Sequence, residues 1–272
     1  MKISIITPTY NYGRFLEANL RSVEAQQGDF EIEHIIFDCM STDFTESIVN
    51  HRGRIKGLTL VYRREIDSGQ TNAINKGFAI ASGDIVAWLN ADERLLPGAL
   101  EIVRNAFLQN PGIDIIFGNS NYIGVDGNII EIKREFGFSF RMLIEYGCYI
   151  PSCATFFRRS VFLKGGVLDE QMRVCMDYEW YVRLYVSGLK FLHIDETIAE
   201  FVWHESNISM KFRERSDIEH RYVVSTYVDN PIYRSMLILC PFIFRLKWRI
   251  YRNVTRLLRF ARRRVLPDIS IS

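Results

Sequence analysis

The chain has 272 residues, of which 48% are hydrophobic and 24% charged, enough apolar material for one large α/β domain; this excludes a disordered or fibrous protein. Its formal net charge of +2 hides a division, because ten of the 34 basic residues lie between positions 230 and 266, where there is no acid. The remaining 24 basic residues, 34 less those ten, face 32 acidic ones, which indicates an acidic body with a basic tail.

Cysteine usage and the amino terminus both indicate a reducing cytosol. The five cysteines are odd in number and show no Cys-x-x-Cys spacing, so neither a disulfide framework nor a zinc site is predicted. We interpret them as reduced core thiols. The amino terminus enters a strand directly, without the long apolar region of a signal peptide, which predicts retention in the cytosol.

Residues 1 to about 120 alternate short apolar runs with helical patterns, as βαβ units do. Apolar residues at helical spacing predict helices around residues 15–23, 74–81 and 100–107. No Gly-x-Gly-x-x-Gly or Gly-x-x-x-x-Gly-Lys-Ser/Thr loop is present, which disfavours dinucleotide binding and nucleoside triphosphatases of that kind. Strands are expected at Ile3–Ile6, His34–Phe37, Leu58–Tyr62, Ile85–Leu89 and Ile113–Phe117.

Polar residues follow the first two expected strands. The first ends in the turn 7–13, whose hydroxyls and aromatic ring can cradle a nucleobase, or which is an ordinary loop with Thr9 or Asn11 as a helix cap. The second ends in Asp38, a carboxylate that can accept from a base N–H or a ribose hydroxyl. Residues 41–43, Ser-Thr-Asp, are typical of capping.

We place the active site at Asn90-Ala91-Asp92-Glu93, together with the polar stretch 65–77. The run Ile85–Leu89 reads as a strand buried on both faces of a parallel sheet, and ligands of open α/β sheets bind at the carboxyl edge. Oxygen ligands there suit Mg²⁺ or Mn²⁺ bridging to phosphates. The alternative is that Asp92 and Glu93 cap a helix.

Residues 120 to 210 are aromatic-rich and less regular, as expected of an acceptor-binding half. Asp177 opens a predicted helix at 178–186 and is either a general base or a helix cap. His204 follows a predicted strand and is a metal ligand, a pyrophosphate donor or a hydrogen-bonded structural residue. Short strands are expected at Asn128–Ile132, Ala154–Phe157 and Ile198–Trp203.

The last 40 residues change character. The apolar run Met236–Phe244 is only nine residues long, well under the ~20 that span a bilayer. Beyond it, arginines recur every three or four residues on one face of a helix and apolar residues on another. We favour a basic amphipathic helix on an anionic membrane. The alternatives are docking on its own domain, a partner helix, or RNA, for which no reading motif is present.

Five short sequence blocks, taken in their order along the chain, resemble those of the family 2 glycosyltransferases, which are inverting enzymes of GT-A-type fold. The resemblance spans roughly residues 3 to 211. It implies an α/β fold with a Rossmann-like mixed sheet flanked by helices. The blocks are Ile5–Asn11, Phe37–Asp38 with Ser41–Asp43, Asp67–Gln70 with Asn72–Gly77, Leu89–Glu93 and Met176–Trp180.

The resemblance also implies roles for individual residues. Asp92 would hold Mn²⁺ or Mg²⁺ on the donor's diphosphate, and Asp177 would be the catalytic base. The family's acid-x-acid pattern begins here with Asn90, which leaves Asp92 as the main ligand, and His204 falls where related enzymes often bring a histidine toward the metal. Thr7, Thr9, Tyr10, Asp38 and Asp67 would hold the nucleoside, with Asn75 and Lys76 supporting the pocket.

The expected function is metal-dependent inverting transfer from a nucleoside-diphosphate sugar, with UDP favoured, to a hydroxyl of a saccharide or lipid-linked saccharide in surface polysaccharide synthesis. Residues 1–228 would form the transferase, with a nucleotide-sugar half to about 120, and 229–272 the basic tail. We expect a cytoplasmic protein peripheral to the inner face of the membrane, with no nucleic-acid partner. A catalytically silent membrane-associated scaffold and a sugar nucleotidyltransferase are the alternatives.

Overall fold

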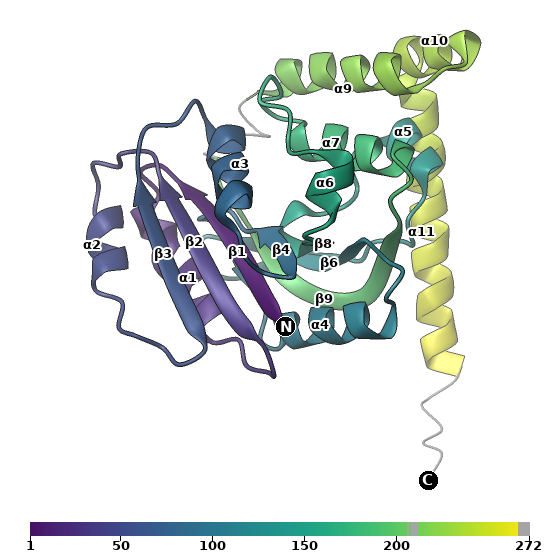
Figure 1. Cartoon of the computed structure of the whole chain (residues 1–272). Helices are drawn as coiled ribbons and strands as arrows, with labels where there is room; N and C mark the ends of the chain where they lie inside the picture. The colour runs from purple at the N-terminus through teal and green to yellow at the C-terminus, as the bar shows by residue number, and fades with distance from the viewer. Residues whose placement is uncertain (206, 208–211, 266–272) are drawn as a thin grey trace.

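A mixed sheet of nine strands lies at the centre of the protein (Figure 1). The computed structural model describes the backbone of residues 1–205, 207 and 212–265, and the side chains of those up to 255 except 213. The strand order is β3-β2-β1-β4-β8-β6-β9-β5, and β7 pairs with β6 outside this path. The strands are β1 (Lys2–Thr9), β2 (Glu31–Asp38), β3 (Leu58–Arg64), β4 (Ile85–Trp88), β5 (Glu93–Leu95), β6 (Ile115–Gly124), β7 (Ile129–Lys133), β8 (Thr155–Arg158) and β9 (Phe191–Trp203).

The first half of the sheet is parallel, and its strands β1, β2 and β4 are buried on both faces, whereas β3 at the sheet edge is partly exposed. Strand β1 pairs in parallel with β2 and β4, and β2 pairs in parallel with β3. Successive residues of β1 point to opposite faces, so Ile3 and Ile5 pack in the core cluster that contains Leu100, whereas Ile6 packs with Ile74 and Phe78. The uninterrupted apolar runs of the sequence reflect this burial on two faces.

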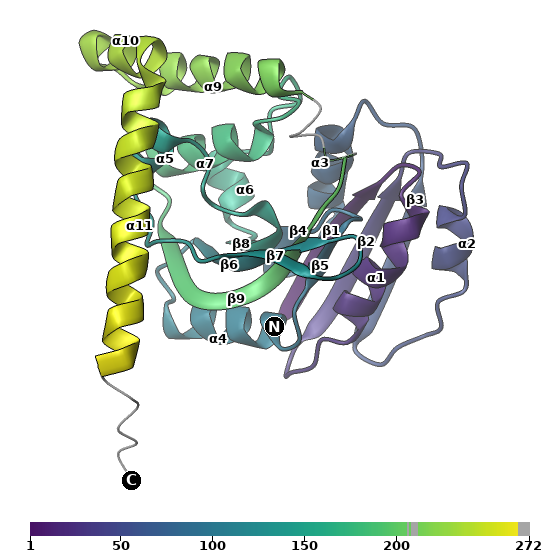
Figure 2. The ribbon, with the colours of Figure 1, turned by 180° about the vertical axis from the view of Figure 1, so that it is seen from behind.

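The second half of the sheet mixes directions. Strand β8 is antiparallel to β4 and β6, and the long, bent β9 runs parallel to β6 and antiparallel to β5 (Figures 1 and 2). The interpretation of Asp92 and Glu93 as helix caps is wrong. Glu93 pairs with Phe201 in β5 instead, and the next helix begins only at Ala99, after Gly98 at a left-handed φ of 76°.

Helices cover both faces of the sheet. Residues of α3, α5, α7, α9 and α10 share one core cluster, and α4 belongs to the cluster on the other face. The helices are α1 (Gly13–Glu24), α2 (Thr45–Asn50), α3 (Gln70–Ile80), α4 (Ala99–Gln109), α5 (Phe140–Tyr146), α6 (Val161–Gly165), α7 (Met176–Val186), α9 (Arg213–Tyr227), α10 (Pro231–Leu239) and α11 (Pro241–Val265), with a 3₁₀ turn η1 at Ser152–Ala154.

The expected strands and helices are confirmed, with different ends and several additions. Strand β6 continues to Gly124, and β9 begins at Phe191, seven residues earlier than expected. The short β5 and the helices α2, α5, α6 and α9 were missed. The five cysteines are free, but Cys148 and Cys240 are exposed because they lie in loops, so the interpretation of all five as core thiols is wrong.

The basic amphipathic helix forms as α11, and it lies along α5 at one side of the molecule (Figure 2). Part of its cationic side is turned inward: Lys247 pairs with Glu145, and Arg252, 8% exposed, lies 3.5 Å from Glu135. Buried carboxylates need such partners, which explains the orientation. Docking on its own domain is therefore what residues up to 255 show; the side chains of Arg256, Arg259 and Arg263 lie outside the described residues.

Among the described helices, none has an apolar stretch long enough to cross a bilayer.

Replacing Glu145 with alanine is expected to lower the free energy of unfolding by about 2–4 kcal/mol. Its fully buried carboxylate accepts hydrogen bonds from Arg141, Tyr233, Lys247 and Trp248, joining α5 to α10 and α11. Burial alone would raise the pKa of Glu145, but these donors lower it to about 2. Its contribution is therefore present above the unfolded pKa, near 4.5, and is lost as pH falls toward 2.

Urea unfolding measures this effect. The control is Glu101→Ala on an exposed position of α4, which should change stability by less than ~0.5 kcal/mol. Equal stability of the two variants would contradict the role of Glu145.

Candidate active site

The carboxyl ends of β1, β2 and β4 meet at one edge of the sheet, as the sequence predicted for parallel strands. Thr9 stands in register with Asp38, and Asn90 follows β4 by two residues. Thr9 is 5% exposed, and its hydroxyl makes no hydrogen bond to any described residue. Tyr10 is 60% exposed at the same edge. These two residues offer a buried hydroxyl and an accessible ring to a ligand.

Thr7 lies behind this edge rather than on it. The residue is fully buried, and its hydroxyl is 2.9 Å from His34 Nε2 and 3.5 Å from Asn19 Oδ1. Thr7 therefore offers no surface to a nucleoside, and its hydroxyl instead helps to hold α1 on the sheet. Asn19 in turn donates to the backbone carbonyls of Asn90 and Glu93, so this buried network fixes the turn that carries Asp92.

Asp38 is fully buried and organises the loop after β2. One carboxylate oxygen accepts from the backbone N–H and hydroxyl of Ser41, and the other accepts from the Tyr62 hydroxyl at 2.6 Å. The guanidinium of Arg64 lies 3.6 Å away. Burial, followed by the hydrogen bond to Asp38, raises the pKa of Tyr62. The carboxylate thus supports the wall of the edge, next to Met40 at a positive φ of 53°.

Some of the site residues predicted in the polar stretch 65–77 lie at the carboxyl edge of the sheet, and others support that edge from behind. Asp67 accepts from the backbone N–H of Gly69 at the start of α3. Gln70, which sequence reasoning did not single out, donates to Asn90 Oδ1 at 2.6 Å and fixes that carboxamide. Gln70 belongs to the block Asp67–Gln70 that resembles the family 2 glycosyltransferases, and this position was the one sequence feature that pointed to it.

Asn75 and Lys76 support the pocket from behind. Asn75 donates to the carbonyl of Leu168 at 2.9 Å and accepts from its N–H at 3.1 Å, which ties α3 to the segment before α7. Lys76 donates to the carbonyl of Ile66 and pairs with Glu65. Both side chains are engaged with the protein itself.

Asp92 and His204, 112 residues apart in sequence, form the centre of the site. His204 Nε2 lies 2.9 Å from Asp92 Oδ2, because the antiparallel pairing of β5 with β9 brings the ends of these strands together. His204 is 8% exposed and stacks on Phe15 at 4.6 Å between ring centroids. Asn207 Nδ2 lies 3.4 Å from the same carboxylate oxygen. Phe15 and Asn207 were not predicted; only the polar run after Trp203 hinted at the latter.

Asp177 is placed in the first turn of α7, close enough to Glu93 for its charge to act weakly on that carboxyl group. Burial of its carboxyl group raises the pKa of Asp177 to about 6. The thiol of Cys148 lies 3.8 Å from Asp177 Oδ2, and the backbone N–H of Tyr178 donates to Oδ1. Glu93 is 1% exposed; burial, then the charge of Asp92, and more weakly that of Asp177, raise the pKa of Glu93. A carboxylate with a pKa near neutrality can take a proton during a reaction.

Asp92 and His204 suit a divalent metal ion as a partial set of ligands. No group of three or more His, Cys, Asp or Glu side chains gathers as a metal site among the described residues. Mg²⁺ and Mn²⁺ commonly take only one or two protein ligands and complete their shell with substrate phosphates and water. A carboxylate oxygen and an imidazole nitrogen in contact fit that pattern.

Comparison with known proteins identifies relatives of this chain. The family model described as "Glycosyl transferase family 2" matches residues 4–165. An uncharacterized glycosyltransferase of Nostoc sp. is 34% identical over 219 residues, 77% of this chain and 67% of that protein. A "PGL/p-HBAD biosynthesis glycosyltransferase" of Mycobacterium bovis is 30% identical over 199 residues, 70% of this chain and 73% of that protein.

Solved structures share the fold. S. aureus TarS 1-349 in complex with UDP-GlcNAc matches with a TM-score of 0.64 at 18% identity, covering 88% of this chain and 70% of that one. The mannosyltransferase PcManGT from Pyrobaculum calidifontis, in complex with GDP-Man and Mn²⁺, matches with a TM-score of 0.63 at 14% identity, covering 89% and 71%. The expected GT-A-type mixed sheet flanked by helices is confirmed.

Proposed function

The chain belongs to glycosyl transferase family 2 and is a glycosyltransferase, and from this premise we propose that it moves a sugar from a nucleoside-diphosphate sugar to an acceptor hydroxyl with inversion. The observation that carries the proposal is the contact between Asp92 and His204 at the carboxyl edge of β4, with the carboxyl group of Asp177 close enough to Glu93 for its charge to act there. In support, structural neighbours are described in complex with UDP-GlcNAc or with GDP-Man and Mn²⁺.

The donor would lie along the edge formed by β1, β2 and β4. Thr9 and Tyr10 would contact the nucleoside, with Asp38 and Asp67 shaping the walls of that pocket. Asn90, its carboxamide fixed by Gln70, would meet the sugar nucleotide. Asp92 and His204 would hold the divalent ion, which supplies Lewis-acid stabilisation of the leaving diphosphate.

Asp177 would act on the acceptor. Its carboxylate would take the proton of the acceptor hydroxyl while the acceptor oxygen bonds to the anomeric carbon and the bond from that carbon to the diphosphate oxygen breaks. One displacement inverts the anomeric centre, and the nucleoside diphosphate leaves with the electron pair. The acceptor we propose is a hydroxyl of a saccharide or lipid-linked saccharide, used in surface polysaccharide synthesis at the cytoplasmic face of a membrane.

Thermal unfolding with sugar nucleotides tests the proposal. With UDP-, GDP- and TDP-sugars, each with and without Mn²⁺, one nucleotide family is expected to raise the unfolding midpoint by about 5–10 °C at ~100 times its dissociation constant, because binding then contributes about 2.7 kcal/mol. We expect UDP-sugars to do so, in a metal-dependent manner. Absence of a shift with every donor, together with no transfer or donor hydrolysis, would contradict the proposal.

A further inference from the structure

Helices α10 and α11 present apolar side chains to the outside of the molecule. These side chains form a continuous set along both helices, with exposed fractions from 79% at Leu239 to 44% at Leu246. We call this set the outer apolar face; it comprises Ile232, Met236, Leu239, Phe242, Ile243, Leu246, Ile250 and Val254. Contiguous exposed apolar surface on this scale marks a contact site.

The orientation of α11 is fixed by its opposite side. Trp248 donates to Glu145 at 2.7 Å and Lys247 pairs with the same carboxylate, while Arg252 donates to the Tyr146 hydroxyl at 3.1 Å. Ile243, Leu246, Ile250 and Val254 recur every three or four residues on the side of the helix away from these contacts. The apolar stripe therefore faces outward because the buried acids hold the other side.

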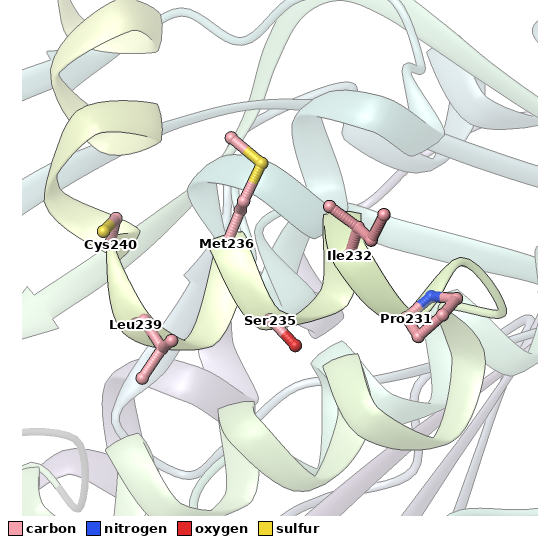
Figure 3. A pocket seen from close by; sticks show the side chains of 6 residues that line it. All are labelled: Pro231, Ile232, Ser235, Met236, Leu239 and Cys240. Carbon is pink, nitrogen blue, oxygen red and sulfur yellow. The ribbon is translucent and has the colours of Figure 1, made fainter.

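The corner where α10 meets α11 is strongly exposed. Leu239 and Phe242 flank it and are 79% and 70% exposed. A shallow hollow of about 430 Å³ runs along α10 and is lined by Pro231, Ile232, Ser235, Met236, Leu239 and Cys240 (Figure 3). Figure 3 shows the Ile232 and Met236 side chains projecting from one side of the helix.

The positive charge around the outer apolar face favours an anionic partner. The sequence has ten basic residues and no acid between positions 230 and 266, and among those described Arg249 is exposed beside the apolar stripe. A second copy of the chain docked through the same face would bring two acid-free cationic helices together, which is unfavourable. Anionic lipid headgroups would instead meet the cations while acyl chains cover the apolar stripe.

We propose that the outer apolar face of α10 and α11 inserts into the headgroup region of an anionic bilayer, with the corner at Leu239 and Phe242 deepest. The inference rests on the proposed function, since a lipid-linked acceptor would lie in the surface that this face contacts. Binding by insertion differs from binding by the arginine stripe alone, because it depends on the apolar side chains as well as on lipid charge.

Vesicle flotation of the full chain tests the inference. The wild type should float with vesicles of phosphatidylcholine and phosphatidylglycerol in a 7:3 ratio, and about tenfold less with phosphatidylcholine alone. Leu239→Ser/Phe242→Ser/Ile243→Ser should lower the partition coefficient at least ~30-fold. The matched control, Leu163→Ser/Ile129→Ser/Ile130→Ser, removes three comparably exposed apolar side chains elsewhere and should float like the wild type. Leu246→Ser/Ile250→Ser repeats the test further along α11, should the corner variant not fold.

Three outcomes would overturn the inference: a wild type that stays unbound, corner variants that float like the control, or a wild-type dimer by light scattering that the corner substitutions dissociate. The last result would assign the face to a second copy. Donor-induced thermal stabilisation is measured on the same samples. If stabilisation persists without flotation, only the membrane inference fails; if flotation persists without stabilisation by any donor, the proposed donor function fails and the membrane inference stands.

Discussion

Asp177→Asn is expected to lower the rate of sugar transfer at least ~100-fold, the low end of general-base contributions, while leaving donor binding intact. Asparagine preserves the size of the side chain and can still accept from the backbone N–H of Tyr178. It cannot take a proton at neutral pH. The acceptor hydroxyl would then have to lose its proton to water, in a site where Asp177 has the only proposed role in proton transfer.

The pH dependence of kcat/KM gives an independent measure of the same base. A base works when it is deprotonated, so kcat/KM should fall tenfold per pH unit below about 6, the pKa to which burial raises Asp177. In Asp177→Asn this acid limb should disappear from the residual activity. The control is Asp126→Asn in the exposed turn between β6 and β7, which should keep both the rate and the limb. Near-normal turnover in Asp177→Asn would remove Asp177 from the role.

Asp92→Ala is expected to abolish Mn²⁺-dependent stabilisation by the donor and to lower transfer by about 10²–10³-fold, corresponding to several kcal/mol of lost charge stabilisation. The loss should exceed that of His204→Ala, because a carboxylate is the harder and negatively charged ligand of the two. The His204 imidazole also stabilises the fold by stacking on Phe15. His204→Ala should therefore lower the unfolding temperature as well.

Calorimetric titration of Mn²⁺ with nucleoside diphosphate separates these effects. Wild type and Asp126→Asn should bind the pair cooperatively, whereas Asp92→Ala should bind nucleotide weakly and with no response to metal. If Asp92→Ala retains metal-dependent binding, the ion is held elsewhere and the assignment to Asp92 is wrong.

The sequence predicted the parallel half of the sheet largely because β1, β2 and β4 are buried on both faces and contain short apolar runs, whereas β3 is a partly exposed edge strand. It did not predict that Thr7 faces inward, although Thr7 shares the face of β1 with Ile3 and Ile5 and strand alternation implies it. It suggested a histidine near the metal only through resemblance. The contact of His204 with Asp92 depends on a three-residue strand, β5, that has too few residues for a period to show.

For the tail, helical spacing identified the faces of α11 but not their orientation. That orientation follows from Glu135 and Glu145, which are more than 100 residues away in sequence, and which no local pattern links to Lys247 or Arg252. The sequence predicted an arginine face and an apolar face for this helix, and the described side chains show that the apolar residues, with Arg249 beside them, lie on the outer side. A local sequence pattern does not show which buried charges pair over long distances in sequence, so it could not predict which side of α11 faces the domain.

The pairing of β9 with β5 and β6 also determines when Asp92 and His204 can come together during synthesis. The segment matched by the family model ends at residue 165, yet within the described part of the chain β5 pairs with β9 alone, and the contact of Asp92 with His204 requires that strand to be in place. Such non-local pairing forms late, because its loop-closure entropy must be overcome first. If the proposed roles hold, a nascent chain that has emerged from the ribosome only as far as β8 would carry most of the nucleotide edge but would lack both Asp177 and His204, so we expect no sugar transfer before β9 is complete.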